Sequence, residues 1–108
     1  MPQEEKEMAK YLSNAFSLQM VDTPATVSFI EVKPEEIPEG AVSCVGHADT
    51  AAVLSSILGH AVKFNRISLH LEHGDELYIA QLTGGRLPEG ATTLPEGFSF
   101  KFIKATIA

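Results

Sequence analysis

Residues 46–66 read GHADTAAVLSSILGHAVKFNR, and they contain the only strongly helical pattern in the chain. Four apolar residues recur at the spacing of a buried helical stripe: Val53, Leu54, Ile57 and Leu58. Asp49 or Thr50 suits the N-cap position, and Gly59 suits the C-cap. The pattern therefore predicts a helix over Asp49–Leu58.

Polar residues stand directly ahead of this predicted helix. The first turn of a helix presents unpaired backbone N–H groups and the positive end of the helix dipole, and both attract phosphate or carboxylate. His47 precedes that turn, which gives it the most functional position among the four histidines. We hypothesise that His47 belongs to an anion site, although capping and packing account for many such histidines.

The composition limits the class of protein. With 108 residues, 44% of them hydrophobic, the chain suits one domain with a modest core. A net charge of -6 argues against a nucleic-acid coat protein, because such a surface needs many lysines and arginines. Cys44 stands alone in an apolar run, which indicates a buried thiol in a reducing cytosol.

The apolar runs and the N-terminal residues favour neither a membrane span nor a signal peptide. The apolar runs are much shorter than a membrane span, and the first residues are rich in glutamate, unlike a signal peptide. We therefore expect a cytoplasmic protein without a membrane partner. Residues 1–9 are predicted to be a poorly ordered lead-in, and residues 10–108 are predicted to form the domain.

Several segments carry strand patterns. Ile67–Glu72 alternates apolar and polar residues, HGD turns the chain, and Glu76–Leu82 reads as a return strand, so this stretch predicts a hairpin. Pro34–Gly40 predicts a loop or one helical turn. These elements predict a single α/β (α+β) domain, in which helices pack against a mixed sheet of about five strands. Four further strands are predicted: Lys10–Phe16, Ala25–Val32, Ala41–Val45 and Phe98–Ala108.

A second polar set follows the return strand. Gln81 stands at its end, and the loop TGGRLPEG that comes next carries Arg86 and Glu89. Its glycines allow backbone to approach a ligand closely. Asn14 and Ser17 stand in the same way after the first strand. Turn chemistry and solvated surface explain these residues equally well without a site.

Metal and nucleophile chemistry are poorly supported. Candidate metal ligands are His47 with Asp49, and His70 with His73 beside Asp75, but neither group has the same-face spacing of zinc sites. No GxSxG-like elbow occurs that would activate a serine. We therefore expect neither a metal nor another cofactor.

Four segments together resemble one protein family. They are YLSNAFSLQM from residue 11, GHADTAAVLSSILG from residue 46, NRISLHLEHGDELYIAQL from residue 65 and RLPEG from residue 86. Their order and nearly their spacing are similar to those of the viral anti-CRISPR ring nucleases. The resemblance covers Tyr11 to about Gly90.

The resemblance implies a function and an assembly. Members of that family are metal-independent enzymes that cleave cyclic tetra-adenylate, the second messenger of type III CRISPR complexes. They act as homodimers that hold the ring across the two-fold interface. Their fold is a mixed sheet with helices against it.

The resemblance also implies roles for residues. His47 matches the general acid, and Arg86 and Glu89 match positions beside the scissile phosphate. Where some relatives have serine, this chain has Asp49, which either joins the ligand site or caps the helix. The remaining matches to ligand-site positions are Asn14, Ser17, Gln19, Thr50, Arg66 and Gln81.

This chemistry suits the residue types. A ribose 2′-hydroxyl attacks its own phosphate, so the protein orients it in line and handles charge. His47 then protonates the leaving 5′-oxygen, and Arg86 stabilises the phosphorane-like charge. Glu89 orients one of these side chains or acts as base. The expected product is linear di-adenylate.

Two other classes of function compete with a ring nuclease. A binding module would capture the cyclic nucleotide without cleaving it, as a sponge or sensor. A viral transcription factor would read duplex DNA, but the acidic balance and the lack of a basic stripe disfavour that partner.

Overall fold

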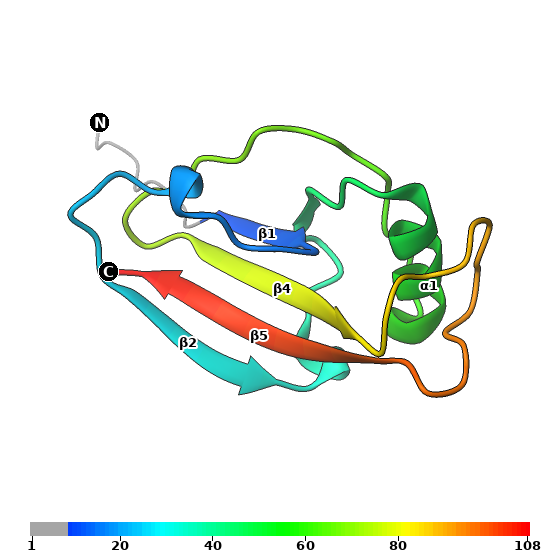
Figure 1. The fold of residues 1–108 in the computed structure, drawn as a ribbon. Helices are drawn as coiled ribbons and strands as arrows, with labels where there is room; N and C mark the ends of the chain where they lie inside the picture. Colours follow the sequence, from blue (N-terminus) through cyan, green and yellow to red (C-terminus); the bar gives the residue numbers. More distant parts are fainter. Residues whose placement is uncertain (1–8) are drawn as a thin grey trace.

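The fold is described by a computed structural model that covers residues 9–108. Five strands form one mixed sheet in the spatial order β2-β5-β4-β1-β3 (Figure 1). β1 runs parallel to β3 and β4, whereas β5 runs antiparallel to β4 and β2. The predicted class, one α+β domain with a mixed five-stranded sheet, is confirmed. The strands are β1 Lys10–Ser13, β2 Val27–Val32, β3 Val42–Ser43, β4 Glu76–Thr83 and β5 Ser99–Ile107.

The centre of the sheet is β4, because four consecutive residues, Leu77–Ala80, are buried. Side chains alternate between the two faces of a strand. Tyr78 and Ala80 therefore pack on the face that α1 covers, whereas Leu77 and Ile79 pack on the opposite face. Burial on both faces explains why this strand reads as a continuous apolar run.

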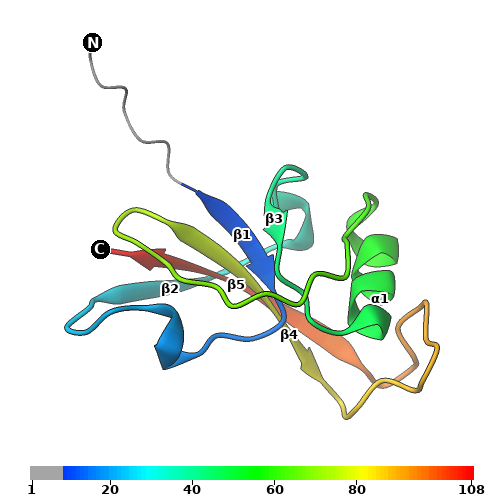
Figure 2. The same cartoon turned by 90° about the horizontal axis from the view of Figure 1, so that it is seen from above.

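Within residues 9–108 there is one α-helix, α1, which spans Ala48–Leu58. Its buried Leu54 and Ala51 join the core cluster beneath it. Two views place α1 at the end of the sheet toward which β4 runs, beside the loop that joins β4 to β5 (Figure 1, Figure 2). The helix ends as predicted at Gly59, whose φ of 79° is left-handed and whose N–H donates to Ser55 O.

The predicted start of this helix is wrong by one residue. The N-cap is His47, in extended conformation, rather than Asp49 or Thr50, which lie in the first turn. The apolar stripe sets where a helix packs, but its first residue depends on where β3 delivers the chain. Just after the helix, the buried Nδ1 of His60 has no hydrogen-bond partner within residues 9–108.

The predicted hairpin is wrong as well. Residues 67–71 form no strand, and Leu71 N–H donates one backbone hydrogen bond, to Met20 O at 2.6 Å. The alternation has another cause: Leu69 and Leu71 pack against the sheet face opposite α1, and His70 faces outward. Both edges of β4 are occupied by β1 and β5, so no edge remains for this segment.

Other element predictions differ only in length. The first strand ends at Ser13 instead of Phe16, and the strand predicted over Ala41–Val45 shortens to β3. The Pro34–Gly40 segment contains the predicted helical turn, η2 (Pro34–Glu36), and a second 3-10 turn, η1 (Leu18–Met20), follows β1. No helix in the described residues is long and apolar enough to cross a membrane.

The predicted lead-in lies outside the described residues except for Ala9. That residue is joined to the sheet, because its C=O accepts from Glu76 N–H at 3.0 Å and its N–H donates to the Asp75 carboxylate at 3.3 Å. Asp75 thus fixes the point where the described chain enters β1.

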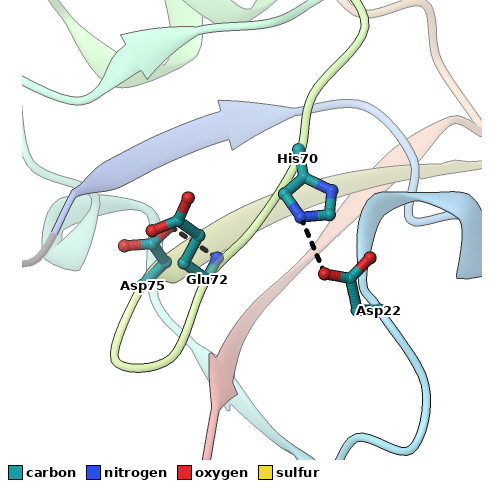
Figure 3. Close-up of polar contacts among 4 residues, drawn as sticks. All are labelled: Asp22, His70, Glu72 and Asp75. Carbon is teal, nitrogen blue, oxygen red and sulfur yellow. Dashed lines mark hydrogen bonds and ion pairs between the residues drawn. The ribbon is translucent and has the colours of Figure 1, made fainter.

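The buried Asp75 organises the turn that enters β4. Its Oδ2 accepts from Glu72 N–H at 2.8 Å, and its backbone C=O accepts from Ile107 N–H at 3.1 Å (Figure 3). Nearby, His70 Nε2 lies 3.4 Å from the carboxylate of Asp22, which belongs to the loop after η1 (Figure 3). Through its carboxylate and its backbone C=O, Asp75 therefore ties together the starts of β1 and β4 and the end of β5.

We predict that Asp75→Ala lowers the free energy of unfolding by roughly 2–4 kcal/mol, because the backbone N–H groups of Ala9 and Glu72 lose their carboxylate acceptor. Urea denaturation followed by circular dichroism measures the change. Asp22→Ala is the matched control, because the Asp22 side chain is 91% exposed and its ion pair contributes little. Equal losses in both variants would contradict the role of Asp75.

Candidate functional site

The carboxyl ends of three parallel strands meet at one end of the sheet. β1 ends just before Asn14, β3 leads into His47, and β4 ends with Gln81 to Thr83. In open sheets of this kind, ligands bind in the crevice outside the carboxyl ends of parallel strands. The polar residues singled out in the sequence follow these strands, so the topology brings them to one place.

A cleft of about 550 Å³ opens there. Seven of the ten predicted site residues line it: Asn14, His47, Asp49, Thr50, Gln81, Arg86 and Glu89. The cleft also has apolar walls made by Leu82, Leu87 and Phe100. The sequence reasoning missed these three, because Leu82 and Phe100 look like core residues of strands and nothing in the loop pattern singles out Leu87. The mixed polar and apolar lining is typical of a small-molecule site.

Three predicted site residues do not line the cleft. Ser17 and Gln19 belong to η1 and its cap, where Ser17 Oγ accepts from Gln19 N–H at 3.2 Å. Arg66 lies close by, because a Cβ placed on Gly46 would be 3.5 Å from Arg66 Cγ. The Arg66 side chain therefore lies beside Gly46, just before His47.

Two asparagines hold the backbone that delivers His47. Asn14 Oδ1 accepts from Gly46 N–H at 3.4 Å, which joins the end of β1 to the start of α1. Asn65 Nδ2 donates to Ser43 O at 2.7 Å, and Asn65 N–H donates to Val45 O at 2.8 Å. Hydrogen bonds from both sides thus fix the chain at the start of the helix.

His47 itself is exposed and makes no side-chain cap. Its C=O accepts from Ala51 N–H at 3.0 Å, so the residue starts the helix through its backbone alone. The imidazole is then available to a ligand, next to the positive end of an 11-residue helix. This position favours an anion beside His47 and the buried Thr50.

The loop of residues 84–98 carries Arg86 and Glu89 back toward α1. Gly84, with φ of 107°, makes its first turn, and a Cβ there would lie 2.7 Å from Gly97 O. Only glycine allows the two ends of the loop to close at this distance. The loop then meets the helix where Gly90 N–H donates to Asp49 Oδ1 at 3.2 Å.

The charged groups of the cleft balance one another in sign. Arg86 and the helix start are positive, whereas Asp49 and Glu89 are negative. Within residues 9–108, no hydrogen bond or ion pair joins the side chains of His47, Arg86 and Glu89. Each of the three is therefore available to a ligand instead of being held by another. An acid, a guanidinium and a carboxylate in one cleft are suited to phosphoryl chemistry.

Other reactive groups lie apart from this cleft. No cluster of three His, Cys, Asp or Glu side chains able to hold a metal occurs within the part of the chain described. Burial raises the pKa of the Cys44 thiol, which keeps it protonated and poorly nucleophilic.

Comparison with known proteins places the chain in a family. The family model described as STIV B116-like matches residues 10–99, which include the whole lining of the cleft up to Glu89. Uncharacterized protein ORF116 of Acidianus filamentous virus 1 is 33% identical over 101 residues, covering 88% of this chain and 86% of the relative. This chain belongs to the STIV B116-like family. The sequence relative and the structural relative below both come from archaeal viruses, so the STIV B116-like family is a viral one.

A solved relative has the same fold. B116 of Sulfolobus turreted icosahedral virus superimposes with a TM-score of 0.76, covering 91% of this chain and 98% of B116, at 23% sequence identity. At that identity the likeness concerns the fold, and it agrees with the five-stranded sheet described above.

Proposed function

We propose that this chain is a metal-independent ring nuclease, an anti-CRISPR protein that cleaves cyclic tetra-adenylate and switches off type III CRISPR signalling. The observation that carries the proposal is the cleft itself. It gathers His47, Arg86 and Glu89 from distant segments at a helix N-terminus. These are the same residues that match catalytic positions in the anti-CRISPR ring nucleases.

The proposed ligand suits the cleft in charge and in surface. A phosphate is attracted to the start of α1 and to the Arg86 guanidinium, which forms paired N–H bonds with its oxygens. The apolar walls, including Leu87 and Phe100, offer surface to an adenine ring. Asn14 and Gln81 add polar side chains at the strand ends. One cleft thus supplies groups for a phosphate and for a base.

A homodimer follows from the size and symmetry of the ring. Four linked nucleotides are larger than one cleft of about 550 Å³. Two copies of the chain related by a two-fold axis would present two identical clefts to a ring of matching symmetry. We therefore propose a homodimer that holds the ring between its subunits, in the cytoplasm of an infected host cell.

The proposed reaction requires no external nucleophile. The ribose 2′-oxygen forms a bond to the adjacent phosphorus, and the bond from phosphorus to the 5′-oxygen breaks. His47 donates a proton to that 5′-oxygen, while Arg86 stabilises the charge on the phosphoryl oxygens. Glu89 accepts the 2′-hydroxyl proton, or it orients Arg86 or His47 while a solvent water accepts that proton. The products carry a 2′,3′-cyclic phosphate and a 5′-hydroxyl.

A time course with cyclic tetra-adenylate tests the proposal. Purified protein is incubated with the ring in excess chelator, and the products are analysed by mass spectrometry. The expected result is linear di-adenylate that ends first in a cyclic phosphate. Products with a 5′-phosphate, or cleavage that requires added magnesium, would contradict 2′-hydroxyl attack.

A second candidate function is capture of the ring without cleavage. This alternative is favoured because, within residues 9–108, no hydrogen bond or ion pair joins Glu89 to His47 or Arg86, and capture needs no preassembled acid and base. A sponge or sensor of this kind would bind the ring and return it intact in the same time course. Salt-sensitive binding of duplex DNA, which neither candidate predicts, would instead point to a transcription factor.

A further inference from the structure

Two side chains of α1 attach the tip of the loop of residues 84–98. Asp49 Oδ1 accepts from Gly90 N–H at 3.2 Å, and Ser56 Oγ donates to Thr92 O at 2.9 Å. Within residues 9–108, these are the hydrogen bonds that join residues 86–92 to the rest of the protein. We propose that Asp49 is a positioning residue that latches this loop to α1 and thereby places Arg86 and Glu89 in the cleft.

The arrangement on the helix supports a latch. Asp49 and Ser56 are separated by two helical turns, so they lie on the same face of α1. Their partners, Gly90 and Thr92, are two residues apart in the loop. The turn at Gly90 and the two residues after it therefore lie beside one face of the helix and are held at two points.

The contacts at the base of the loop do not fix the position of its tip, which therefore depends on the hydrogen bonds with Asp49 and Ser56. Gly84 and Gly97 close the base, and the other hydrogen bonds inside the loop are local turns, from Ala91 N–H to Pro88 O and from Phe98 N–H to Pro95 O. Such turns shape the loop, but they do not fix its distance from α1. That distance is set where the loop meets Asp49 and Ser56.

The charge of Asp49 also fits a latch better than a ligand contact. A carboxylate opposes a phosphate, but a carboxylate in the first turn of a helix is stabilised by the helix dipole. Its Oδ1 is engaged by the Gly90 N–H. Gly90 directly follows Glu89 and comes four residues after Arg86. Fixing the position of Gly90 therefore restricts the positions of both side chains. The proposal revises Asp49 from a ligand-site residue to one that acts through the loop.

The test compares Asp49→Asn with Asp49→Ala. Asparagine removes the charge but keeps an oxygen that accepts from Gly90 N–H, whereas alanine removes both. Hydrogen exchange of the peptide over residues 86–92 is measured in the protein without ligand. We expect exchange in Asp49→Ala to be roughly 3–10-fold faster than in the wild type, and exchange in Asp49→Asn to be close to the wild type. Ser56→Ala is expected to change exchange in the same direction as Asp49→Ala.

Kinetics of ring cleavage give a second readout, which rests on the proposed function. A displaced Arg86 and Glu89 should lower kcat by roughly 10-fold in Asp49→Ala, with kcat largely restored in Asp49→Asn. The controls are Asp22→Ala, an exposed aspartate, and Ser28→Ala, an exposed serine on β2. Neither should change exchange or kcat.

The outcomes separate the latch from the enzyme. If Asp49→Asn and Asp49→Ala behave alike in exchange and in kcat, the carboxylate acts through its charge and the latch is refuted. If the wild-type protein does not cleave the ring but the exchange pattern is as expected, the latch stands and the proposed function fails. Should Asp49→Ala not fold, unchanged exchange in Ser56→Ala would overturn the proposal and faster exchange would support it.

Discussion

Replacing His47 with alanine should leave cyclic tetra-adenylate bound but slow its cleavage by roughly 10²–10⁴-fold, the usual contribution of a general acid. The imidazole is exposed at the start of α1 and makes no capping hydrogen bond, so its loss leaves the helix intact. Binding should persist because the helix start and Arg86 remain to hold the phosphate. The variant therefore separates the proton transfer from ligand capture.

Single-turnover cleavage and calorimetric binding, measured on the same preparation of His47→Ala, give the two quantities. His73→Ala is the matched control, since His73 is exposed in the turn before β4 and lies outside the cleft. Wild-type cleavage in His47→Ala would exclude His47 as the acid. Loss of binding without any change in the cleavage rate of bound ring would assign it to ligand contact instead.

Replacing Arg86 with alanine should reduce the rate by roughly 10²–10³-fold, as does the loss of a donor aimed at developing charge. Unlike His47→Ala, this variant should also bind the ring more weakly, because the guanidinium meets the phosphate before the reaction as well as during it. Arg86→Lys should recover binding more fully than rate, since an ammonium keeps the charge but not the planar paired donors.

The measurement is the rate at saturating ring together with the dissociation constant for Arg86→Ala and Arg86→Lys. Lys10→Ala is the control, because Lys10 is an exposed cation at the opposite end of β1 from the cleft. A change confined to the dissociation constant would show that Arg86 binds ground state and transition state equally, which fits a sponge better than an enzyme.

His47→Ala and Arg86→Ala together distinguish the two candidate functions. An enzyme loses rate in both variants, but it loses affinity mainly in Arg86→Ala. A binding module shows no rate in any form, and its affinity depends on Arg86 more than on His47. The time course of the wild-type protein with the ring in excess chelator shows whether the ring is cleaved, and this result decides which pattern applies.

Seven of the ten residues that the resemblance matches to site positions line the cleft, and three do not. Asn14 and His47 follow strands and Gln81 lies near the end of one, but which of these strands run side by side could not be anticipated, because strand pairing depends on long-range packing. Ser17 and Gln19 could not be excluded in advance, because the direction of the chain after β1 depends on how η1 packs. The hydrogen bond from Gly90 to Asp49 spans 41 residues, and no local pattern indicates it.

The sequence by itself determined the helix, its glycine C-cap and a strand over residues 76–82, because spacing, capping and apolar runs act within a few residues. Only the tertiary structure decided that β4 pairs with β1 and β5, and that residues 67–71 cross the sheet face without joining it. A strand has two edges, and which neighbours take them depends on long-range packing that alternation does not encode. The cleft likewise depends on the tertiary structure, because it forms where three chain segments and the loop of residues 84–98 converge.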